Sequence, residues 1–141
     1  METTQNNPSK TLNIFLWAAQ IILAAMFLMT GAMKLTSPIE QLSAMLPWTK
    51  DVPDGLVRFI GASELMGGIG LLLPSILRIK PILTPIASLG LALIILFATM
   101  LHISRGESPV IGIHIIIMAI SIFIAWGRIK KEQIPSKNKI D

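Results

Sequence analysis

Four long apolar stretches limit what this chain can fold into. They cover about residues 12–33, 56–73, 86–103 and 109–126. Each has the roughly 17–25 residues that an α-helix needs to cross the hydrocarbon core of a bilayer. The last two are rich in β-branched residues, but in lipid their length and lack of alternation favour helix over strand. The sequence therefore predicts four transmembrane helices.

Composition points the same way. Of the 141 residues, 52% are hydrophobic and 14% are charged, against about 25% charged residues in a soluble domain. A net charge of +4 does not by itself indicate nucleic acid, and we expect none as a partner. The absence of cysteine excludes an intrinsic dithiol or disulfide mechanism and thiolate-ligated zinc or iron–sulfur.

We predict an all-α transmembrane four-helix bundle with up-down topology. A polar tail (1–10) precedes the four-helix domain (11–127), and a basic tail without fixed structure (128–141) follows it. The first stretch, 12–33, could instead be a cleaved signal peptide. It is longer than the usual apolar region of about 7–15 residues and no clear cleavage site follows, which favours a retained span.

Capping signals suggest where the helices begin and end. Ser37 and Glu40 form a capping-box pattern, which predicts a short interfacial helix in the first outer loop. That helix would end near Pro47, with Trp48 at the level of the lipid headgroups. An ordinary connecting loop is the equally open alternative.

Further helix starts and ends are expected at particular residues of the later spans. Asp51, Thr84 and Ser108 are candidate helix caps because each shortly precedes a proline in a helix-start pattern. Pro74 is expected to stop the second span, and Gly127 the fourth.

Positive charge predicts the orientation in the membrane. With the N-terminus inside, the inner segments hold eight basic residues: Lys10, Arg78, Lys80, Arg128, Lys130, Lys131, Lys137 and Lys139. The outer segments hold four: Lys34, Lys50, Arg58 and Arg105. Cytoplasmic loops carry the excess of lysine and arginine. We therefore expect a multi-pass protein of the inner membrane with both termini in the cytoplasm.

Glu64 lies within the second apolar stretch, where a carboxylate costs at least about 2.5–3.5 kcal/mol. At about 100° per residue, Gly61, Glu64 and Gly68 fall on one helical face. Ser63 and Gly67 add a small-xxx-small pair. We therefore expect Glu64 to face the bundle interior and the four small residues to pack against other helices.

Titratable side chains gather in the predicted outer half of the bundle. The candidate ligand-binding residues are Lys34, Glu64, His102, His114 and Arg105. Each has a plainer interpretation as an interfacial anchor or a structural hydrogen-bonding group. The sequence leaves open whether Lys34, Glu64 and His102 meet. Two histidines and a carboxylate are a known ligand set for metals, but the spacing here gives no convincing motif, and we predict no metal.

Several short motifs, taken in order, resemble the DoxX-like family of small four-span bacterial membrane proteins. They are GAMKL at 31–35, FIGASELMGGIGLLLP at 59–74, Pro85 with Gly90-Leu91, and HISRGE at 102–107. The family is named for a subunit linked to thiosulfate:quinone oxidoreductase and terminal quinol oxidase. The resemblance implies that Lys34, Glu64 and His102 occupy the family's recurrent polar positions.

Two functional hypotheses follow. In the first, the chain is a redox-associated subunit that binds a quinone or similar hydrophobic molecule near Glu64. Lys34 or His102 would donate to the quinone carbonyls, and Glu64 is the candidate proton relay. No electron carrier is evident, so a partner subunit would deliver electrons. In the second, the chain is a non-enzymatic scaffold, lipid-binding or small-solute-binding module. Whether it is an enzyme or a homo-oligomer stays open.

Overall fold

The computed structural model describes residues 8–139, and every regular element in that range is helical. This confirms the all-α prediction. Four helices are long and apolar enough to cross a membrane: α1 (Lys10–Thr36), α3 (Asp54–Leu77), α4 (Leu83–Ser104) and α5 (Pro109–Trp126). Most of the predicted N-terminal tail lies outside the described residues.

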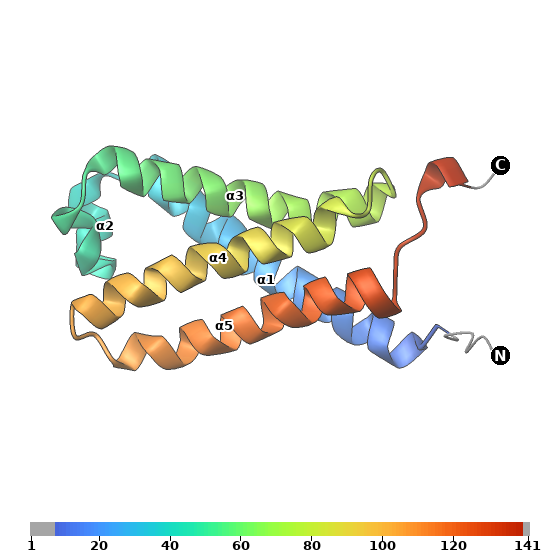
Figure 1. The fold of residues 1–141 in the computed structure, drawn as a ribbon. Helices are drawn as coiled ribbons and strands as arrows, with labels where there is room; N and C mark the ends of the chain where they lie inside the picture. Colours follow the sequence, from blue (N-terminus) through green and yellow to red (C-terminus); the bar gives the residue numbers. More distant parts are fainter. Residues whose placement is uncertain (1–7, 140–141) are drawn as a thin grey trace.

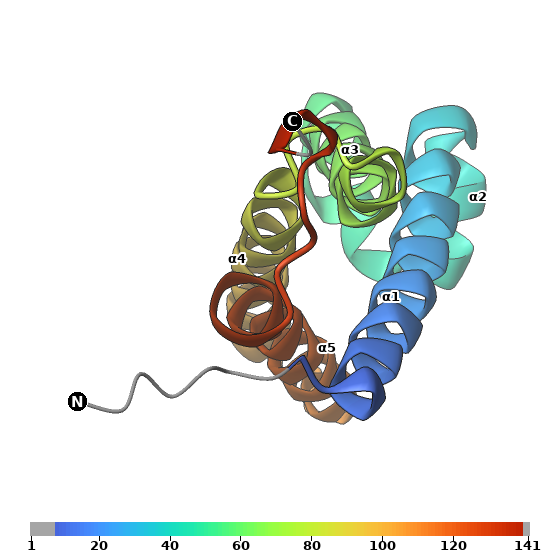
Figure 2. The same ribbon diagram turned by 90° about the vertical axis from the view of Figure 1, so that its right-hand side faces the viewer.

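The long helices surround a common axis in the order α1, α3, α4, α5 (Figure 2). Successive long helices run in alternating directions (Figure 1). One end of the bundle carries α2 and the α4–α5 turn, and we call it the loop end. The other end carries the start of α1, the α3–α4 turn and the end of α5, and we call it the terminal end.

The first connection contains the expected short helix, α2 (Ile39–Met45), followed by the 3₁₀-helix η1 (Pro47–Asp51). The predicted capping box is wrong, because Pro38 is the N-cap residue and makes no side-chain cap bond. The level of Trp48 relative to the lipid headgroups stays a prediction. Its side chain is buried and packs with Leu42 and Val57 over the loop end of the bundle.

The helix ends differ from several predictions. α3 passes Pro74 and ends at Leu77, because neighbouring side chains can satisfy backbone groups near a proline in a transmembrane helix. The missing N–H of Pro74 leaves the carbonyl of Gly70 without its helical donor, and the next carbonyl, that of Leu71, accepts from the amide of Gln20 over 2.7 Å. Thr84 is not a cap. It lies buried inside α4, and its hydroxyl is 2.7 Å from that of Ser75 on α3.

The other predicted caps also fail. Asp51 belongs to η1 and is not the residue before α3. Ser108 precedes α5 but makes no side-chain cap bond. The cap that forms is Ser9, whose hydroxyl accepts from the amide of Leu12 at 3.3 Å. A span stabilised by side-chain packing does not depend on such caps.

The prediction of an unstructured basic tail is wrong for its first residues. The α-helix α5 ends at Trp126 with Gly127 as its C-cap residue, as predicted, but the chain then continues through a π-turn, η2 (Gly127–Lys131). Gly127 lies directly against Leu16 of α1. Arg128 is then only 4% exposed. The beginning of the tail is therefore part of the packed bundle at the terminal end.

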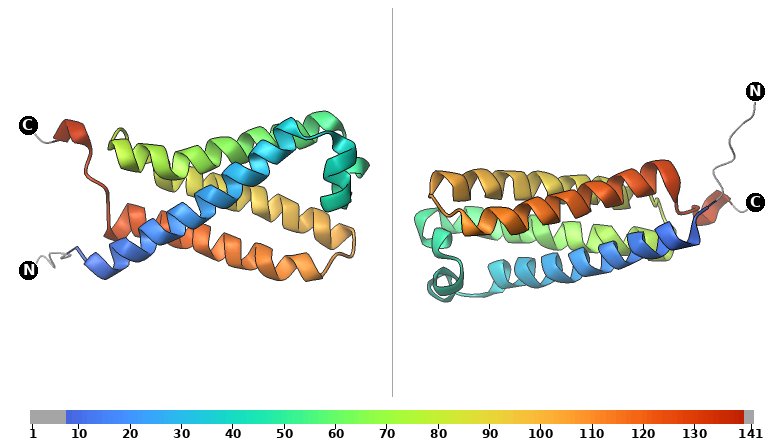
Figure 3. Two further views of the ribbon diagram at one scale, coloured as in Figure 1. Left: turned by 180° about the vertical axis from the view of Figure 1, so that it is seen from behind. Right: turned by 90° about the horizontal axis from the view of Figure 1, so that it is seen from below.

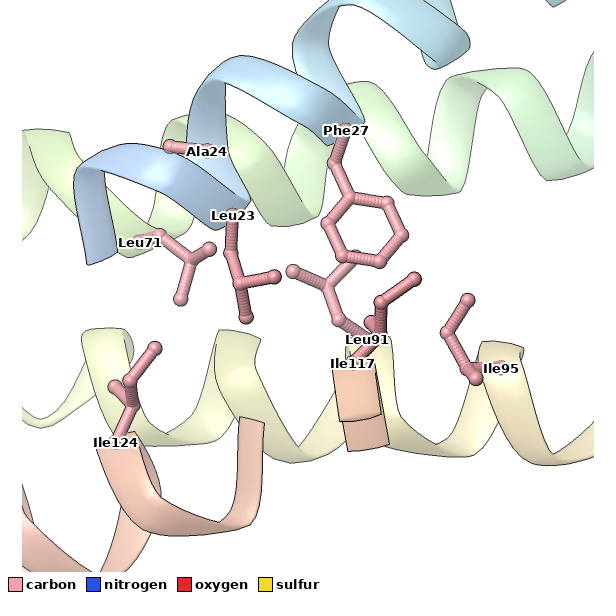
Figure 4. Packing of buried hydrophobic residues seen from close by; sticks show 8 residues of the cluster. All are labelled: Leu23, Ala24, Phe27, Leu71, Leu91, Ile95, Ile117 and Ile124. Atoms are coloured by element: carbon pink, nitrogen blue, oxygen red, sulfur yellow. The ribbon is translucent and has the colours of Figure 1, made fainter. Parts of the chain in front are cut away.

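Apolar packing fills the middle and the terminal half of the bundle. Figure 4 shows residues from all four long helices that make up this core: Leu23, Ala24, Phe27, Leu71, Leu91, Ile95, Ile117 and Ile124. Helix α1 crosses the bundle obliquely (Figure 3). It lies beside α5 at the terminal end and beside α3 at the loop end, so α1 and α5 separate toward the loop end.

Glycines let α1 and α3 approach closely. A Cβ on Gly61 would lie 2.7 Å from Cβ of Lys34 and 3.0 Å from the carbonyl oxygen of Gly31. A Cβ on Gly31 would lie 2.7 Å from the carbonyl oxygen of Gly61. Gly68 lies similarly against Leu28, and Gly67 against Leu91 of α4. Small residues at helix crossings have this effect in membrane proteins.

Gly61→Ala should therefore lower the free energy of unfolding by about 1–3 kcal/mol, because an added methyl overpacks a backbone contact. Gly90→Ala is the matched control, since a Cβ there would meet nothing within 4 Å. Thermal unfolding in a fixed detergent measures both. Equal melting temperatures for the two variants would contradict the close approach of α1 and α3.

Candidate functional site

A cavity of about 540 Å³ lies in the loop half of the bundle. Residues of α1, η1, α3, α4 and α5 line it, and most of its wall is apolar. It is partly open, and it is bordered by Phe59 and Phe97, which are also exposed on the outer surface of α3 and α4. Its volume lies within the range of about 300–1,000 Å³ typical of small-molecule sites.

An ion pair between α1 and α3 forms one wall of the cavity. Nζ of Lys34 lies 2.7 and 2.8 Å from the two carboxylate oxygens of Glu64. The hydroxyl of Thr30 donates to the same carboxylate at 3.2 Å. The two side chains are 9% and 6% exposed, so the pair is desolvated. Each charge thus has the partner that burial in an apolar medium demands.

Two further groups hold Lys34 in place. Its Nζ lies 5.9 Å from the centre of the Trp48 ring, a cation–π distance. The guanidinium of Arg58 donates to the backbone carbonyls of Lys34 and Ser37, at 2.6 and 2.8 Å. Arg58 therefore satisfies carbonyls at the end of α1, where the helix leaves them unpaired. The lysine is fixed at its backbone and at its ammonium group.

A chain of polar contacts closes the loop end. Nδ1 of His102 lies 2.5 Å from a carboxylate oxygen of Glu107. The other oxygen of Glu107 accepts from Nε of Arg105 at 2.9 Å, and Arg105 also pairs with Asp51 of η1. The hydrogen bond with His102, and then that with Arg105, lower the pKa of Glu107. The bonds to Asp51 and Glu107 raise the pKa of Arg105.

The tautomer of His114 follows from its neighbour. The hydroxyl of Thr99 donates to the carbonyl of Ile95 over 2.7 Å. Because a hydroxyl carries one hydrogen, its oxygen accepts from Nδ1–H of His114, 3.1 Å away. In the neutral ring, Nε2 is then unprotonated. Nδ1 of His102 faces a carboxylate, so the neutral form of this ring also carries its hydrogen on Nδ1. In the neutral form of each ring, Nε2 is then the nitrogen that can accept from a ligand.

The structure brings four of the five candidate ligand-binding residues to one cavity: Lys34, Glu64, His102 and His114. The rings of His102 and His114 lie edge to face, with centroids 5.1 Å apart. Arg105 is not among the lining residues and belongs to the salt bridges of the α4–α5 turn. Within residues 8–139, no group of three or more histidine and carboxylate side chains is arranged to hold a metal ion.

The sequence analysis did not predict a second buried polar network, which lies at the terminal end, because it placed the candidate residues in the other half of the bundle. Arg128 donates to the side-chain oxygens of Gln20 and Asn13, at 2.6 and 2.7 Å. Gln20 continues the network to Ser75 on α3. Its signals were two amides, Asn13 and Gln20, inside an uncharged span and an arginine shortly after the last apolar stretch.

Comparison with known proteins identifies the family. A model described as the DoxX-like family matches residues 18–124, a range that covers most of the four long helices and the whole cavity lining. The chain belongs to the DoxX-like family. The searches of curated proteins and of solved structures found no match. Family membership and four apolar helices make this a multi-pass membrane protein in contact with the lipid bilayer.

Removing one member of the buried ion pair should be costly. Lys34→Met leaves Glu64 buried without a counter-charge and should destabilise the protein by about 3–5 kcal/mol. The double variant Lys34→Met/Glu64→Met should recover most of that loss, because it leaves no unpaired charge. Thermal unfolding of both single variants and the double variant in one detergent gives the coupling free energy between Lys34 and Glu64. If the double variant lost as much stability as the two single variants together, the ion pair would be contradicted.

The stability of the α4–α5 turn should depend on pH. The lowered pKa of Glu107 means that its contacts stabilise the fold fully above the ordinary pKa of a glutamate. That contribution is lost as the pH falls through the lowered value. The melting temperature of Glu107→Gln should therefore lie below that of wild type at neutral pH, and the difference should disappear at acidic pH. A difference that does not change with pH would show that the ionised carboxylate does not stabilise the fold.

Proposed function

We propose that this DoxX-like protein is a redox-associated membrane subunit that binds a quinone or similar hydrophobic molecule in the cavity beside Glu64. One observation carries the proposal: a mostly apolar cavity, partly open, with Lys34, His102 and His114 on its wall. A prenylated ring needs an apolar pocket with a few fixed polar groups. Phe59 and Phe97 border the route by which an apolar tail could leave toward lipid.

The polar groups suit a ligand with two oxygens. Lys34 has three N–H donors, and the two short contacts to Glu64 leave one for a ligand oxygen. His114, on α5, presents an unprotonated Nε2, which accepts from a hydroxyl. A quinol offers a hydroxyl donor and an acceptor oxygen at opposite sides of its ring. We therefore expect the reduced form to bind more tightly than the oxidised form.

The proposal needs an electron-carrying partner, because the chain has no cysteine and carries no evident redox group of its own. Such a partner would approach the cavity in the plane of the membrane or at the loop end. The lysine and arginine distribution supports a terminal end that faces the cytoplasm of an inner membrane, with the loop end on the opposite side.

A non-enzymatic scaffold is the alternative. The observation that favours it is the ion pair itself, in which Lys34, Glu64 and Thr30 satisfy one another without a ligand. A buried polar contact can fix the register of two helices. In that case lipid tails would fill the cavity, and substitutions on its wall would change stability but not the selectivity for a ligand.

Tryptophan fluorescence distinguishes the two. Trp48 lines the cavity, whereas Trp17 and Trp126 lie toward the terminal end. In a Trp17→Phe/Trp126→Phe background, a short-chain ubiquinone analogue should quench Trp48 with saturation, and the reduced analogue should compete more strongly. His114→Phe should weaken binding of the reduced analogue about 3- to 10-fold, which corresponds to the loss of one hydrogen bond. His114→Gln should keep most of the affinity.

Linear quenching, equal in wild type and His114→Phe, would indicate partition into the detergent and would contradict the site. A Trp48→Phe variant that retains both other tryptophans is the control. Its emission should not show the saturable component.

A further inference from the structure

A continuous set of polar side chains links the cavity with the loop-end surface. Glu107 lies in the α4–α5 turn, and its side chain is 29% exposed, whereas that of His102 is 12% exposed. The two are 2.5 Å apart. His102 also lines the cavity, next to His114. One imidazole thus touches a water-accessible carboxylate on one side and the cavity on the other.

We propose that His102 and Glu107 form a proton-transfer path between the ligand cavity and water at the loop end. The proposal rests on the proposed function, because it gives the bound quinol a route for its proton. Nε2 of His102 takes a proton from a ligand hydroxyl, and Nδ1 passes its own proton to Glu107. The carboxyl group releases that proton to water. One proton leaves the ligand and one reaches solvent, while the imidazole ends as the other neutral tautomer and resets by proton exchange.

The surroundings support this direction of transfer. Arg105 binds the oxygen of Glu107 that does not contact His102, and Arg105 is itself held by Asp51. The carboxylate is therefore held in place beside the imidazole. On the cavity side, His114 from α5 and Lys34 from α1 line the same space as His102. The imidazole therefore lies between basic groups in the cavity and a carboxylate at the surface. Because the bonds with His102 and Arg105 lower the pKa of Glu107, its carboxyl group readily releases to water a proton that it receives.

Glu64 is not required in this path. Both of its oxygens contact Lys34, and one also accepts from Thr30. The expected proton relay of the cavity is therefore moved from Glu64 to His102, while Glu64 holds the lysine that donates to the ligand. Because imidazole is the side chain best suited to exchange protons near neutral pH, His102 is also the better chemical choice.

The test follows oxidation of a bound quinol. Purified protein is loaded anaerobically with one equivalent of decylubiquinol and mixed with ferricyanide in a weakly buffered solution containing a pH dye. Oxidation of each quinol yields a quinone, two protons and two electrons, and the electrons reduce two ferricyanide ions. We expect His102→Ala to slow oxidation and proton release by about 100-fold, the usual effect of removing an acid–base group. Added imidazole should restore the rate.

Glu107→Gln should slow proton release as well, while Glu40→Gln should not. Glu40 is an exposed carboxylate on α2 at the same end and serves as the matched control. Binding of the quinol is measured first, by its competition at Trp48. If the variants bind the quinol normally and react at the wild-type rate, the proton path would be overturned but the proposed function would not. Slow reaction of His102→Ala without rescue by imidazole would also overturn it. Wild-type protein that binds no quinol would overturn both the path and the proposed function.

Discussion

The ion pair between Lys34 and Glu64 is the interaction on which the rest of this structure depends. Two buried charges on different helices satisfy each other only where they meet, and they can meet only if their helices approach closely. Gly31 and Gly61 provide that approach, with the lysine stem lying directly over Gly61. Arg58 then holds the end of α1, and Trp48 lies beside the ammonium group. The tilt of α1 toward α3 follows from these contacts.

That tilt divides the bundle into two unlike halves. At the terminal end, α1 lies beside α5, and the amide of Gln20 and the guanidinium of Arg128 close the packing with buried hydrogen bonds. At the loop end, α1 has moved away from α5, and the space between the helices remains as a cavity. Its polar groups, Lys34, His102 and His114, therefore gather where side chains do not fill the bundle. A ligand site and a rigid support are thereby built from the same four helices.

Much of this could be predicted from sequence, because hydropathy and length identify membrane spans and a single intramembrane carboxylate identifies an inward face. The sequence left open whether Glu64 meets Lys34, since that contact depends on how two helices cross. Pro74 misled because neighbouring helices and local adjustments can satisfy the backbone groups around a proline in a transmembrane helix. Arg128 misled because a basic residue after a span usually marks the membrane surface. In both cases tertiary contacts outweighed a local rule.

Native mass spectrometry of the protein, gently extracted from its own membrane, tests the central claim most directly. The account predicts one retained hydrophobic molecule per chain, with ring oxygens able to meet Lys34 and His114. It should be lost when Ala98, which lines the cavity, is replaced by tryptophan. Phospholipid alone, retained equally by wild type and Ala98→Trp, would contradict the cavity as a ligand site and leave the ion pair as a device that fixes the packing of α1 on α3.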